Sequence, residues 1–593
     1  MSEPLGAAGV EVAPARAGFV LDAYAARSCP VKTQNHFHPG VEQPRFDDDE
    51  SLHEVFLGGA AFKAQVLDTV LKRYDGRVVD CRGLANQPWS VQVDAALAAM
   101  ADGVDVVIGG VLPLDVPGHR SGRADLYLRG QDTEDGRPGY YPVQVKFHRV
   151  LERVTPSPTR DPQRLSRLGE PVFDAAVEDA ELTFRVSSRE ADLIQLGHYW
   201  RLLEAAGFAS GGEPWAAVIG TDQVQALGNA RVISWVRLDA KVIRTFSRTA
   251  ATGWRRRSPL ERYDHEHGFR VKVAQVAQRQ LGAPDDPPLV VTPIRVRECD
   301  RCVWWEVCRP QLDDDDLSVR IDKSPLDVRE IAVLRRFGVT TVTDLAELDI
   351  DALLPTYLPE VAHRHGGEER LRLAARRATL MVDGVELDRT TEGPIDLPRG
   401  DIEIDFDIET SADDRVYLWG FLVNEPASDA PARYVEFSEF NELTDASELA
   451  LAVAAVTWLR ELVAANPDST VRVYHYSDYE VVRLGRLATA DAEGMVAWAT
   501  EFALDNFCDL FTVMRTHFFG THGLGLKHVA THAAGFSWRD DDPGGLNSQR
   551  WFDDAVHADS PTAREEARRR VLEYNEDDVR ATAALRTWLR SLP

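Results

Sequence analysis

The chain contains 593 residues, with 67 Lys and Arg against 95 Asp and Glu, and a formal net charge of −28. This length is too great for one hydrophobic core, and a composition of 44% hydrophobic and 27% charged residues is typical of a folded soluble chain, so several domains are expected. The acidic charge excludes strong non-specific binding of nucleic acid over the whole surface, because such binding depends on neutralising phosphates. No long apolar run and no basic leader is evident, which predicts a cytoplasmic protein that does not enter a membrane.

The first third of the chain carries polar residues on a regular series of predicted elements. These elements are a helix over 57–71, strands over 122–130 and 140–150, and a capped helix over 187–207. Gln195 and Tyr199, on the last of these helices, are four residues apart and therefore share a helix face. The polar residues, in chain order, are Lys63, Asp125, Gln144, Lys146, Gln195 and Tyr199.

Four cysteines bracket these elements. Cys29 lies upstream, and Cys299, Cys302 and Cys308 form a C-x2-C-x5-C pattern downstream. Disulfides are not expected in a cytosolic chain. Four thiols offer enough soft ligands for a zinc ion or an iron-sulfur cluster, and their spacing alone slightly favours zinc.

This order of motifs resembles the RecB-like PD-(D/E)XK nucleases that carry a 4Fe-4S cluster, over residues 20–310. The resemblance implies a restriction-endonuclease-like α/β core and a cluster bound by the four cysteines. It also implies that Asp125 holds a metal ion, that residue 144 adds a second oxygen ligand, and that Lys146 steadies the water or the developing charge. Gln195 and Tyr199 complete the set of site residues.

Two positions depart from this family pattern. Gln144 and Lys63 stand where the family has, or often has, an acidic residue. Losing carboxylates weakens the binding of Mg²⁺, because hard cations bind largely through charge. Two hypotheses remain for this domain: a weakened nuclease site, or a cluster-stapled module that binds DNA and no longer cuts well.

The middle of the chain is predicted to be helical. Residues 327–354 are expected to form two helices around a turn at Gly338, similar to a helix-hairpin-helix that offers backbone N–H groups to a phosphate. An ordinary helical connector is the alternative interpretation. A basic helix over 363–382 follows and is a candidate lining for a nucleic-acid path, and a Pro- and Gly-rich stretch at 391–400 ends the region.

Within residues 401–410, positions 402–409 alternate strictly between apolar and acidic side chains. This period of two predicts a β-strand with all its carboxylates on one face. Like charges so close together must be screened by water or collected by a cation. The acidic residues are Glu403, Asp405, Asp407 and Glu409.

Two later segments carry further candidate ligands. A second strand is expected over 473–480, ending in H-x3-Y-E with Glu480, and Asp478 is a rival ligand nearby. A long helix is expected over 564–589, where Tyr574 and Asp578 lie four residues apart on one face.

These three motifs together resemble the DEDDy exonucleases, over residues 395–593. The resemblance implies an RNase H-like α/β domain with a mixed sheet. It implies that Asp407, Glu409, Glu480 and Asp578 are ligands of Mg²⁺ or Mn²⁺ and that Tyr574 orients the attacking water. The family's second motif usually ends in Asp, and here it ends in Glu480.

The predicted fold class is therefore multidomain α/β, and the predicted function is a metal-dependent DNA nuclease with 3′ to 5′ exonuclease activity at its C-terminal end. The alternatives are a DNA-binding protein with silent sites and an RNA-directed exonuclease. No G-x4-G-K-[ST] motif is present, so a helicase partner or a free end must supply unwound DNA. The expected domains are a nuclease domain over 1–320, a helical connector over 321–392 and an exonuclease domain over 393–593.

Overall fold

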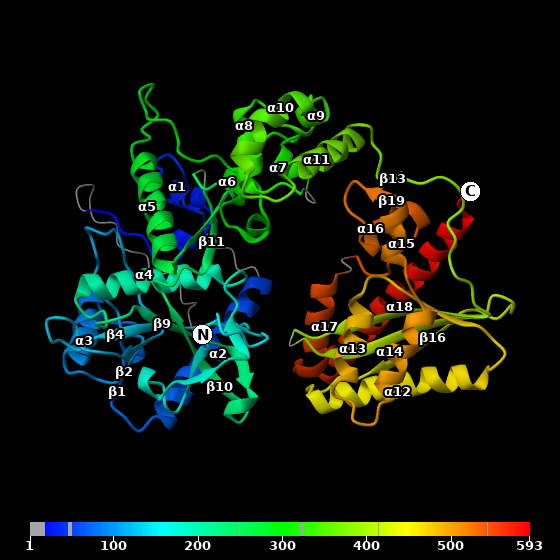
Figure 1. Ribbon diagram of the computed structural model, residues 1–593, viewed down its shortest axis with the longest axis horizontal. Helices are drawn as coiled ribbons and strands as arrows, with labels where there is room; N and C mark the ends of the chain where they lie inside the picture. Colours follow the sequence, from blue (N-terminus) through cyan, green and yellow to red (C-terminus); the bar gives the residue numbers. More distant parts are fainter. Residues whose placement is uncertain (1–17, 45–49, 248, 322–324, 413, 542–543) are drawn as a thin grey trace. The chain divides into compact units, whose positions relative to one another are not determined.

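The computed structural model describes residues 18–44, 50–247, 249–321, 325–412, 414–541 and 544–593. The N-terminal segment that bears on the expected absence of a leader lies outside these residues. The chain divides into two compact units that each combine helices with β-sheets, as the predicted α/β class requires (Figure 1). The first unit comprises Met1–Asp314, Val328–Val333 and Asp351–Glu368, and the second comprises Asp315–Asp327, Leu334–Ile350 and Glu369–Pro593.

The first unit is built on a mixed sheet. Its order within the described residues is β1-β2-β3-β4-β9-β10-β6-β7, and β4 runs parallel to β9 while β2, β3 and β4 are antiparallel neighbours. Two small strand pairs, β5 with β8 and β11 with β12, accompany this sheet. The strands are β1 (Val78–Asp80), β2 (Val106–Ile108), β3 (Leu126–Arg129), β4 (Tyr140–Val145), β5 (Leu151–Arg153), β6 (Gln163–Arg167), β7 (Val177–Asp179), β8 (Leu182–Phe184), β9 (Trp215–Val224), β10 (Ala230–Arg237), β11 (Ile243–Phe246) and β12 (Trp254–Arg257).

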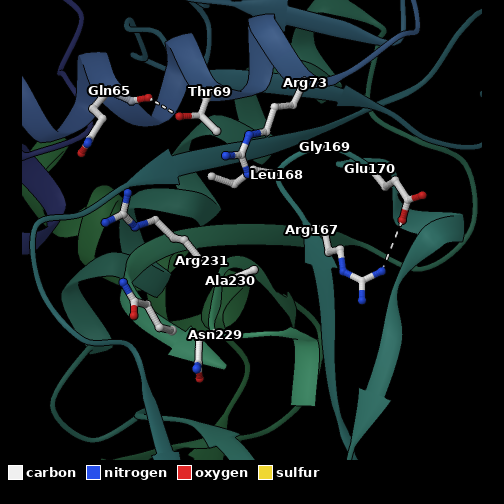
Figure 2. Close-up of a pocket in the computed structure, with 11 residues that line it drawn as sticks. Gln65, Thr69, Arg73, Arg167, Leu168, Gly169, Glu170, Asn229, Ala230 and Arg231 are labelled. Atoms are coloured by element: carbon white, nitrogen blue, oxygen red, sulfur yellow. Dashed lines mark hydrogen bonds and ion pairs between the residues drawn. The ribbon is translucent and has the colours of Figure 1, made fainter. Parts of the chain in front are cut away.

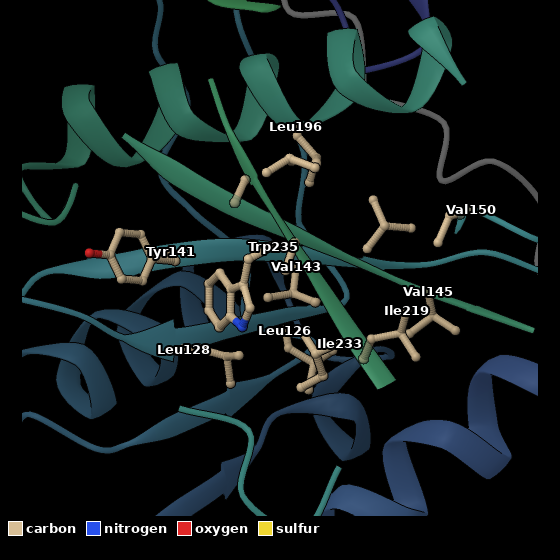
Figure 3. Close-up of a cluster of buried hydrophobic side chains, with 14 of the residues drawn as sticks. Leu126, Leu128, Tyr141, Val143, Val145, Val150, Leu196, Ile219, Ile233 and Trp235 are labelled. Carbon is tan, nitrogen blue, oxygen red and sulfur yellow. The ribbon is translucent and has the colours of Figure 1, made fainter. Parts of the chain in front are cut away.

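Helices cover this sheet and bury its apolar residues. Figure 3 shows Leu196 on α4 pointing towards strands that carry Val143, Ile219 and Trp235. The predicted cap of α4 is wrong, because the helix begins after Arg189 and no side chain caps it. The helices are α1 (Pro30–Phe37), α2 (Glu50–Arg73), α3 (Trp89–Ala101), α4 (Glu190–Ala206), α5 (Pro259–Ala277) and α6 (Trp305–Cys308).

The predicted helical region in the middle of the chain is present. A turn with Gly338 at φ +84° follows the first of the two expected helices, and this left-handed conformation suits a residue without a Cβ. The helices of this region are α7 (Leu317–Arg320), α8 (Val328–Arg336), α9 (Val342–Ala346), α10 (Ile350–Tyr357) and α11 (Gly367–Val382). Among the described helices, none combines the length and the apolar character needed to cross a membrane.

The second unit also contains a mixed sheet. Its order is β16-β15-β14-β17-β18, with β14 antiparallel to β15 and parallel to β17. A separate pair joins β13 to β19. The strands are β13 (Leu387–Arg389), β14 (Ile402–Thr410), β15 (Val416–Asn424), β16 (Arg433–Ser438), β17 (Val471–His475), β18 (Phe507–Asp509) and β19 (Phe518–Gly520).

Helices lie on both faces of this second sheet, with α12 along one face and α18 along the other (Figure 1). The apolar side chains of β14 pack against α12, α13 and α14, so its acidic side chains point to the face that α18 covers. Helix α18 begins with Pro at its first position and a Ser560 cap. The helices are α12 (Asp445–Ala465), α13 (Tyr479–Ala488), α14 (Met495–Asn506), α15 (Leu510–His517), α16 (Leu526–Ala534), α17 (Gly545–His557) and α18 (Pro561–Ser591).

Candidate active site

Strand β14 divides its four carboxylates between two environments, and the first pair is neutralised by arginines. Arg586 of α18 donates to the two carboxylate oxygens of Asp405 at 3.1 and 2.7 Å and also contacts Glu403. Arg590, one turn further on, donates to the two oxygens of Glu403 at 2.9 and 2.8 Å. Glu403 and Asp405 are buried. Of the two alternatives expected from the sequence, water or a cation, this pair has the second, because guanidinium groups neutralise its charge.

The second pair on β14 meets another acid on α18. One ligand atom each from Asp407, Glu409 and Asp578 lies within 4.8 Å of the other two. Glu409 and Asp578 are buried and Asp407 is partly buried. The strand and the helix, although far apart in the chain, thus bring three predicted ligands to one point.

Neutral donors orient these three carboxylates. Asn575 donates from Nδ2 to Oδ2 of Asp407 at 2.7 Å, and Ser548 of α17 donates from Oγ to Oε2 of Glu409 at 2.7 Å. Trp538 donates from Nε1 to Oδ1 of Asp578 at 2.6 Å. These donors fix the carboxylate geometry and leave the negative charge in place, as is common around metal ligands.

Gly420 makes room for one of these donors. It lies opposite Asp407 in the β14–β15 pair, and a Cβ at this position would lie 1.7 Å from Oδ1 of Asn575. Asn575 can therefore reach Asp407 only because residue 420 has no side chain.

The electrostatics of the cluster favour a bound cation. Burial, followed by the charges of Glu409, Asp578 and Glu480, raises the pKa of Asp407 well above its usual range. Burial and the charge of Asp578 raise the pKa of Glu409 to about 8. Burial also raises the pKa of Asp578. Hard oxygen ligands with unbalanced negative charge fit Mg²⁺ or Mn²⁺, so the residues present suit the ion that the resemblance implies.

Glu480 lies beside this cluster, but in a different element from the one predicted. Strand β17 ends at His475, and Glu480 stands in the first turn of α13. Nδ1 of His475 donates to the carbonyl of Ser477 at 2.5 Å and lies 3.4 Å from Oε2 of Glu480. This Oε2 atom is buried and accepts no hydrogen bond from any residue that the structure describes. An orphaned carboxylate oxygen of this kind suits a metal ligand.

The backbone before Glu480 is held in an unusual conformation. Ser477 has φ +101°, and its N–H donates to Oδ1 of Asp509 at 2.9 Å. Such a conformation costs free energy in a residue with a side chain, and it occurs most often at functional sites. Of the two rival acids that follow, Asp478 is exposed and Glu480 is buried. Glu480 lies outside the group of ligand atoms within 4.8 Å, although its charge raises the pKa of Asp407.

Tyr574 joins the cluster through a lysine that sequence reasoning missed. Nζ of Lys527, at the start of α16, donates to the hydroxyl oxygen of Tyr574 at 2.7 Å and lies over its ring. Burial and the charges of Asp578, Glu409 and Asp407 raise the pKa of Tyr574, so the phenol stays protonated. The phenolic proton therefore remains available for donation. The available signal for Lys527 is the stretch GLGLKHVA at 523–530, which falls within the resemblance to the DEDDy exonucleases.

The N-terminal candidate residues also come together, but their charges cancel. Asp125, just before β3, lies 2.8 Å from Nζ of Lys63 and accepts from the N–H of Val145 at 2.8 Å. With its amide oriented to satisfy both groups, Gln144 donates to Oδ2 of Asp125 at 3.2 Å and accepts from the N–H of Asp125 at 3.1 Å. The two residues that depart from the family pattern thus both contact Asp125.

Lys146, which follows β4, contacts Gln195 and lies 3.4 Å from Asp192. Burial lowers the pKa of Lys146. Gln195 in turn donates to the hydroxyl oxygen of Tyr199 at 3.2 Å. Asp192, which sequence reasoning missed, also lies 2.8 Å from Nε2 of His148. Helix α4 therefore faces the end of β4 with the residues that its spacing predicted.

The four cysteines of the predicted cluster line one small pocket beside Trp304 and Trp305. Within the described part of the chain, their sulfur atoms do not form a group in which all atoms lie within 4.8 Å of one another. Burial raises the pKa of Cys29 and of Cys299, and it raises that of Cys308 to about 11. The thiols therefore need a nearby positive charge before they can act as thiolate ligands.

A cavity of about 690 Å³ opens elsewhere in the first unit (Figure 2). Arg73, Arg167 and Arg231 line it, and Arg231 lies over the ring of Phe62. Burial lowers the pKa of Arg231. None of the residues predicted from the sequence to form a site lines this cavity.

Comparison with known proteins covers only the C-terminal part of the chain. A family model described as RNase_H superfamily matches residues 404–590, which include most of β14 and nearly all of α18. No curated protein and no solved structure matches the chain. Residues 404–590 therefore form an RNase H-like domain, which indicates a nuclease-type activity.

Proposed function

We propose that this protein is a metal-dependent nuclease that acts on DNA and removes nucleotides from 3′ ends with its RNase H-like domain. The observation that carries the proposal is the group formed by Asp407, Glu409 and Asp578, whose carboxylate oxygens lie within 4.8 Å of one another at a site where burial and mutual repulsion raise their pKa values. The family match supports the nuclease class, and the DEDDy-like order of motifs supports the direction of cleavage.

The residues of the chain take separate roles in this proposal. Asp407, Glu409, Asp578 and Glu480 hold divalent ions, which when bound supply positive charge to the attacking and leaving oxygens of a phosphodiester. Tyr574, held through its oxygen by Lys527, donates a hydrogen bond to the water that attacks the phosphorus atom and so orients that water.

For the first unit, we propose a RecB-like nuclease site of reduced activity. Strand β3, which Asp125 directly precedes, strand β4 with Gln144, and helix α4 with Gln195 and Tyr199 occur in the order that the resemblance implies, which supports the proposal. Lys63 places an ammonium group where a metal ion would contact Asp125. This contact favours a site that binds metal weakly, and with it the alternative that the first unit binds DNA without cutting it.

A 4Fe-4S cluster bound by Cys29, Cys299, Cys302 and Cys308 is part of the proposal. A single zinc ion with four sulfur ligands needs sulfur atoms about 3.8 Å apart, since each bond is about 2.3 Å long. The four thiols share one pocket without their sulfur atoms all lying within 4.8 Å of one another, and the resemblance favours a cluster over a single zinc ion. The cluster would join Cys29, just before α1, to the segment around α6.

DNA is the proposed partner in spite of the acidic net charge. The cavity lined by Arg73, Arg167 and Arg231 offers local positive charge to a phosphate backbone. An RNA substrate remains the competing hypothesis, because RNase H-like folds serve both polymers. A partner protein such as a helicase would supply single strands.

The test is digestion of end-labelled single- and double-stranded DNA and RNA by the full chain with Mg²⁺ or Mn²⁺. Stepwise shortening of 5′-labelled DNA from its 3′ end is expected, and Asp407→Asn should abolish it. Equal or faster shortening of RNA would replace the DNA assignment, and release of nucleotides from 5′ ends would overturn the exonuclease direction.

A further inference from the structure

A second group of metal-binding side chains lies on α16, on residues that the carboxylate cluster does not use. His528 and His532 are four residues apart on this helix, and their ring centroids are 4.2 Å apart. One ligand atom from each, together with a carboxylate oxygen of Glu386, lies within 4.8 Å of the other two. Two histidines at this spacing present nitrogen ligands on one face of a helix.

The backbone fixes Glu386 and a third histidine beside this helix. Glu386 directly precedes β13, and its carbonyl accepts from the N–H of Thr521 at 3.0 Å as the pairing of β13 with β19 continues. His522 directly follows Thr521, and its Nε2 lies 3.8 Å from Oε2 of Glu386. Nε2 of His528 approaches the same oxygen at 3.5 Å.

These separations suit a shared metal ion better than a direct hydrogen bond. A hydrogen bond between a ring nitrogen and a carboxylate is about 2.7–3.2 Å long. A tetrahedral zinc site with bonds of about 2.1 Å places its ligand atoms about 3.4 Å apart. The observed 3.5 and 3.8 Å match that edge length.

The tautomer of His532 is also the one that a metal ligand needs. Its Nδ1 lies 2.9 Å from the backbone carbonyl oxygen of His528. A carbonyl can only accept, so Nδ1 carries the proton and the lone pair is on Nε2. Histidine ligands commonly donate their other ring nitrogen to a backbone carbonyl in this way.

We propose that Glu386, His528 and His532 bind one Zn²⁺ ion, separately from the carboxylate cluster, and that His522, which lies outside the group within 4.8 Å but close to Glu386, moves in as the fourth ligand. Imidazole nitrogens with one carboxylate are ligands that zinc prefers, whereas Mg²⁺ prefers oxygen alone. The ion would tie α16 to the β13–β19 pair. Because α16 also carries Lys527, the same ion would hold in place the ammonium group that contacts Tyr574.

The test is metal binding to the full chain, with Zn²⁺ and Co²⁺ as probes in the presence of excess Mg²⁺. The wild type should bind about one more zinc ion per chain than His528→Ala/His532→Ala, and its affinity for that ion should exceed the variant's by at least about 100-fold. Zinc should raise the melting temperature of the wild type and leave that of the variant unchanged. His557→Ala, an exposed histidine on α17, is the matched control and should behave as the wild type.

Cobalt distinguishes this site from the other two candidate metal sites. Cobalt bound by nitrogen and oxygen gives tetrahedral visible bands without the sulfur charge-transfer band that a cysteine site produces. Equal zinc uptake by the wild type and the double variant would overturn the proposal, as would loss of this ion on Asp407→Asn. If the double variant does not fold, the exposed His532 allows His532→Gln to be tested with the same readouts.

Discussion

The ammonium nitrogen of Lys63 lies 2.8 Å from Oδ1 of Asp125, the acid that the resemblance to RecB-like nucleases makes a metal ligand. Burial alone would lower the pKa of Lys63, but the charge of Asp125 reverses this effect and raises it. The lysine is therefore charged at neutral pH and acts as a built-in counter-ion for Asp125. A divalent ion can bind here only by displacing this contact.

From this contact we predict that Asp125→Ala lowers total nuclease activity less than Asp407→Ala does. Gln144 contacts Asp125 with a neutral amide where the resemblance implies an acid, so a metal ion would bind less tightly there. Rates with both variants should be measured on the same end-labelled substrates. The opposite ranking would identify the first unit as the main nuclease.

Asp407→Asn and Asp578→Asn should each abolish 3′-end shortening, a loss of roughly 10³-fold or more if a metal ion is lost. Both changes keep the size of the side chain while removing its charge. Glu480→Gln against Asp478→Asn decides which acid is the fourth ligand. Glu480 is buried and Asp478 is exposed, so Glu480→Gln should have the larger effect on the metal concentration needed for half-maximal activity. A larger effect of Asp478→Asn would reverse this assignment.

Tyr574→Phe should reduce the rate less than Asp407→Asn, because it removes one hydrogen bond and leaves every carboxylate in place. Lys527→Met should resemble Tyr574→Phe, since Lys527 holds the phenol at 2.7 Å. In the double variant Tyr574→Phe/Lys527→Met the two reductions in rate should not add, because both changes act on the same hydroxyl group. Single-turnover rates at saturating Mg²⁺ measure this coupling, and additive losses would show that the two residues act independently.

The raised pKa of Glu409 predicts an unusual dependence of stability on pH. Its pKa rises from 4.5 to about 8 on folding, so between these values the folded chain binds more protons than the unfolded chain. Stability without divalent ions should therefore fall as pH rises through this window, by at most about 1.4 kcal/mol per pH unit for this group. The melting temperature of the wild type in chelator, compared with Glu409→Gln, isolates the effect. Adding Mg²⁺ should restore the lost stability at pH 8. A wild type that becomes more stable relative to Glu409→Gln as pH rises in chelator would contradict the prediction.

The cysteine pocket predicts about four iron and four sulfide ions per chain after anaerobic purification. Cys29→Ala should lower both the iron and the sulfide content. It should also destabilise the first unit, because it removes a link between distant segments of the chain. Cys508→Ala, in the second unit, is the control for loss of a thiol. Stoichiometric zinc without iron would replace the cluster with a zinc site.

The periodicity of the sequence predicted the elements better than it predicted their surroundings. A strict alternation over 401–410 correctly indicated a strand with one acidic face, and the pattern over 564–589 correctly indicated a helix. Periodicity names the residues on a face but says nothing about what covers that face. The pairing of Glu403 and Asp405 with arginines almost two hundred residues away therefore could not be anticipated.

Other local features depended on the same distant contacts. Strand β17 ends two residues before Ser477, whose backbone is strained. Glu480 therefore lies in the first turn of a helix, where a continued strand was expected. Lys63 stood out as a departure from a family pattern, yet only the fold placed its ammonium group on Asp125. The sequence thus predicted most reliably those motifs that lie within a single strand or helix, and least reliably the contacts between distant segments.

The division of β14 also separates what holds this domain together from what it does. Glu403 and Asp405, with Arg586 and Arg590, form a closed ionic lock at one end of the strand. Buried ion pairs of this kind can often be exchanged for apolar residues of similar volume with little loss of stability. The lock could therefore be replaced by a hydrophobic contact, while the other half of the same strand must stay acidic. A protein engineer could treat the two ends of one strand as independent parts.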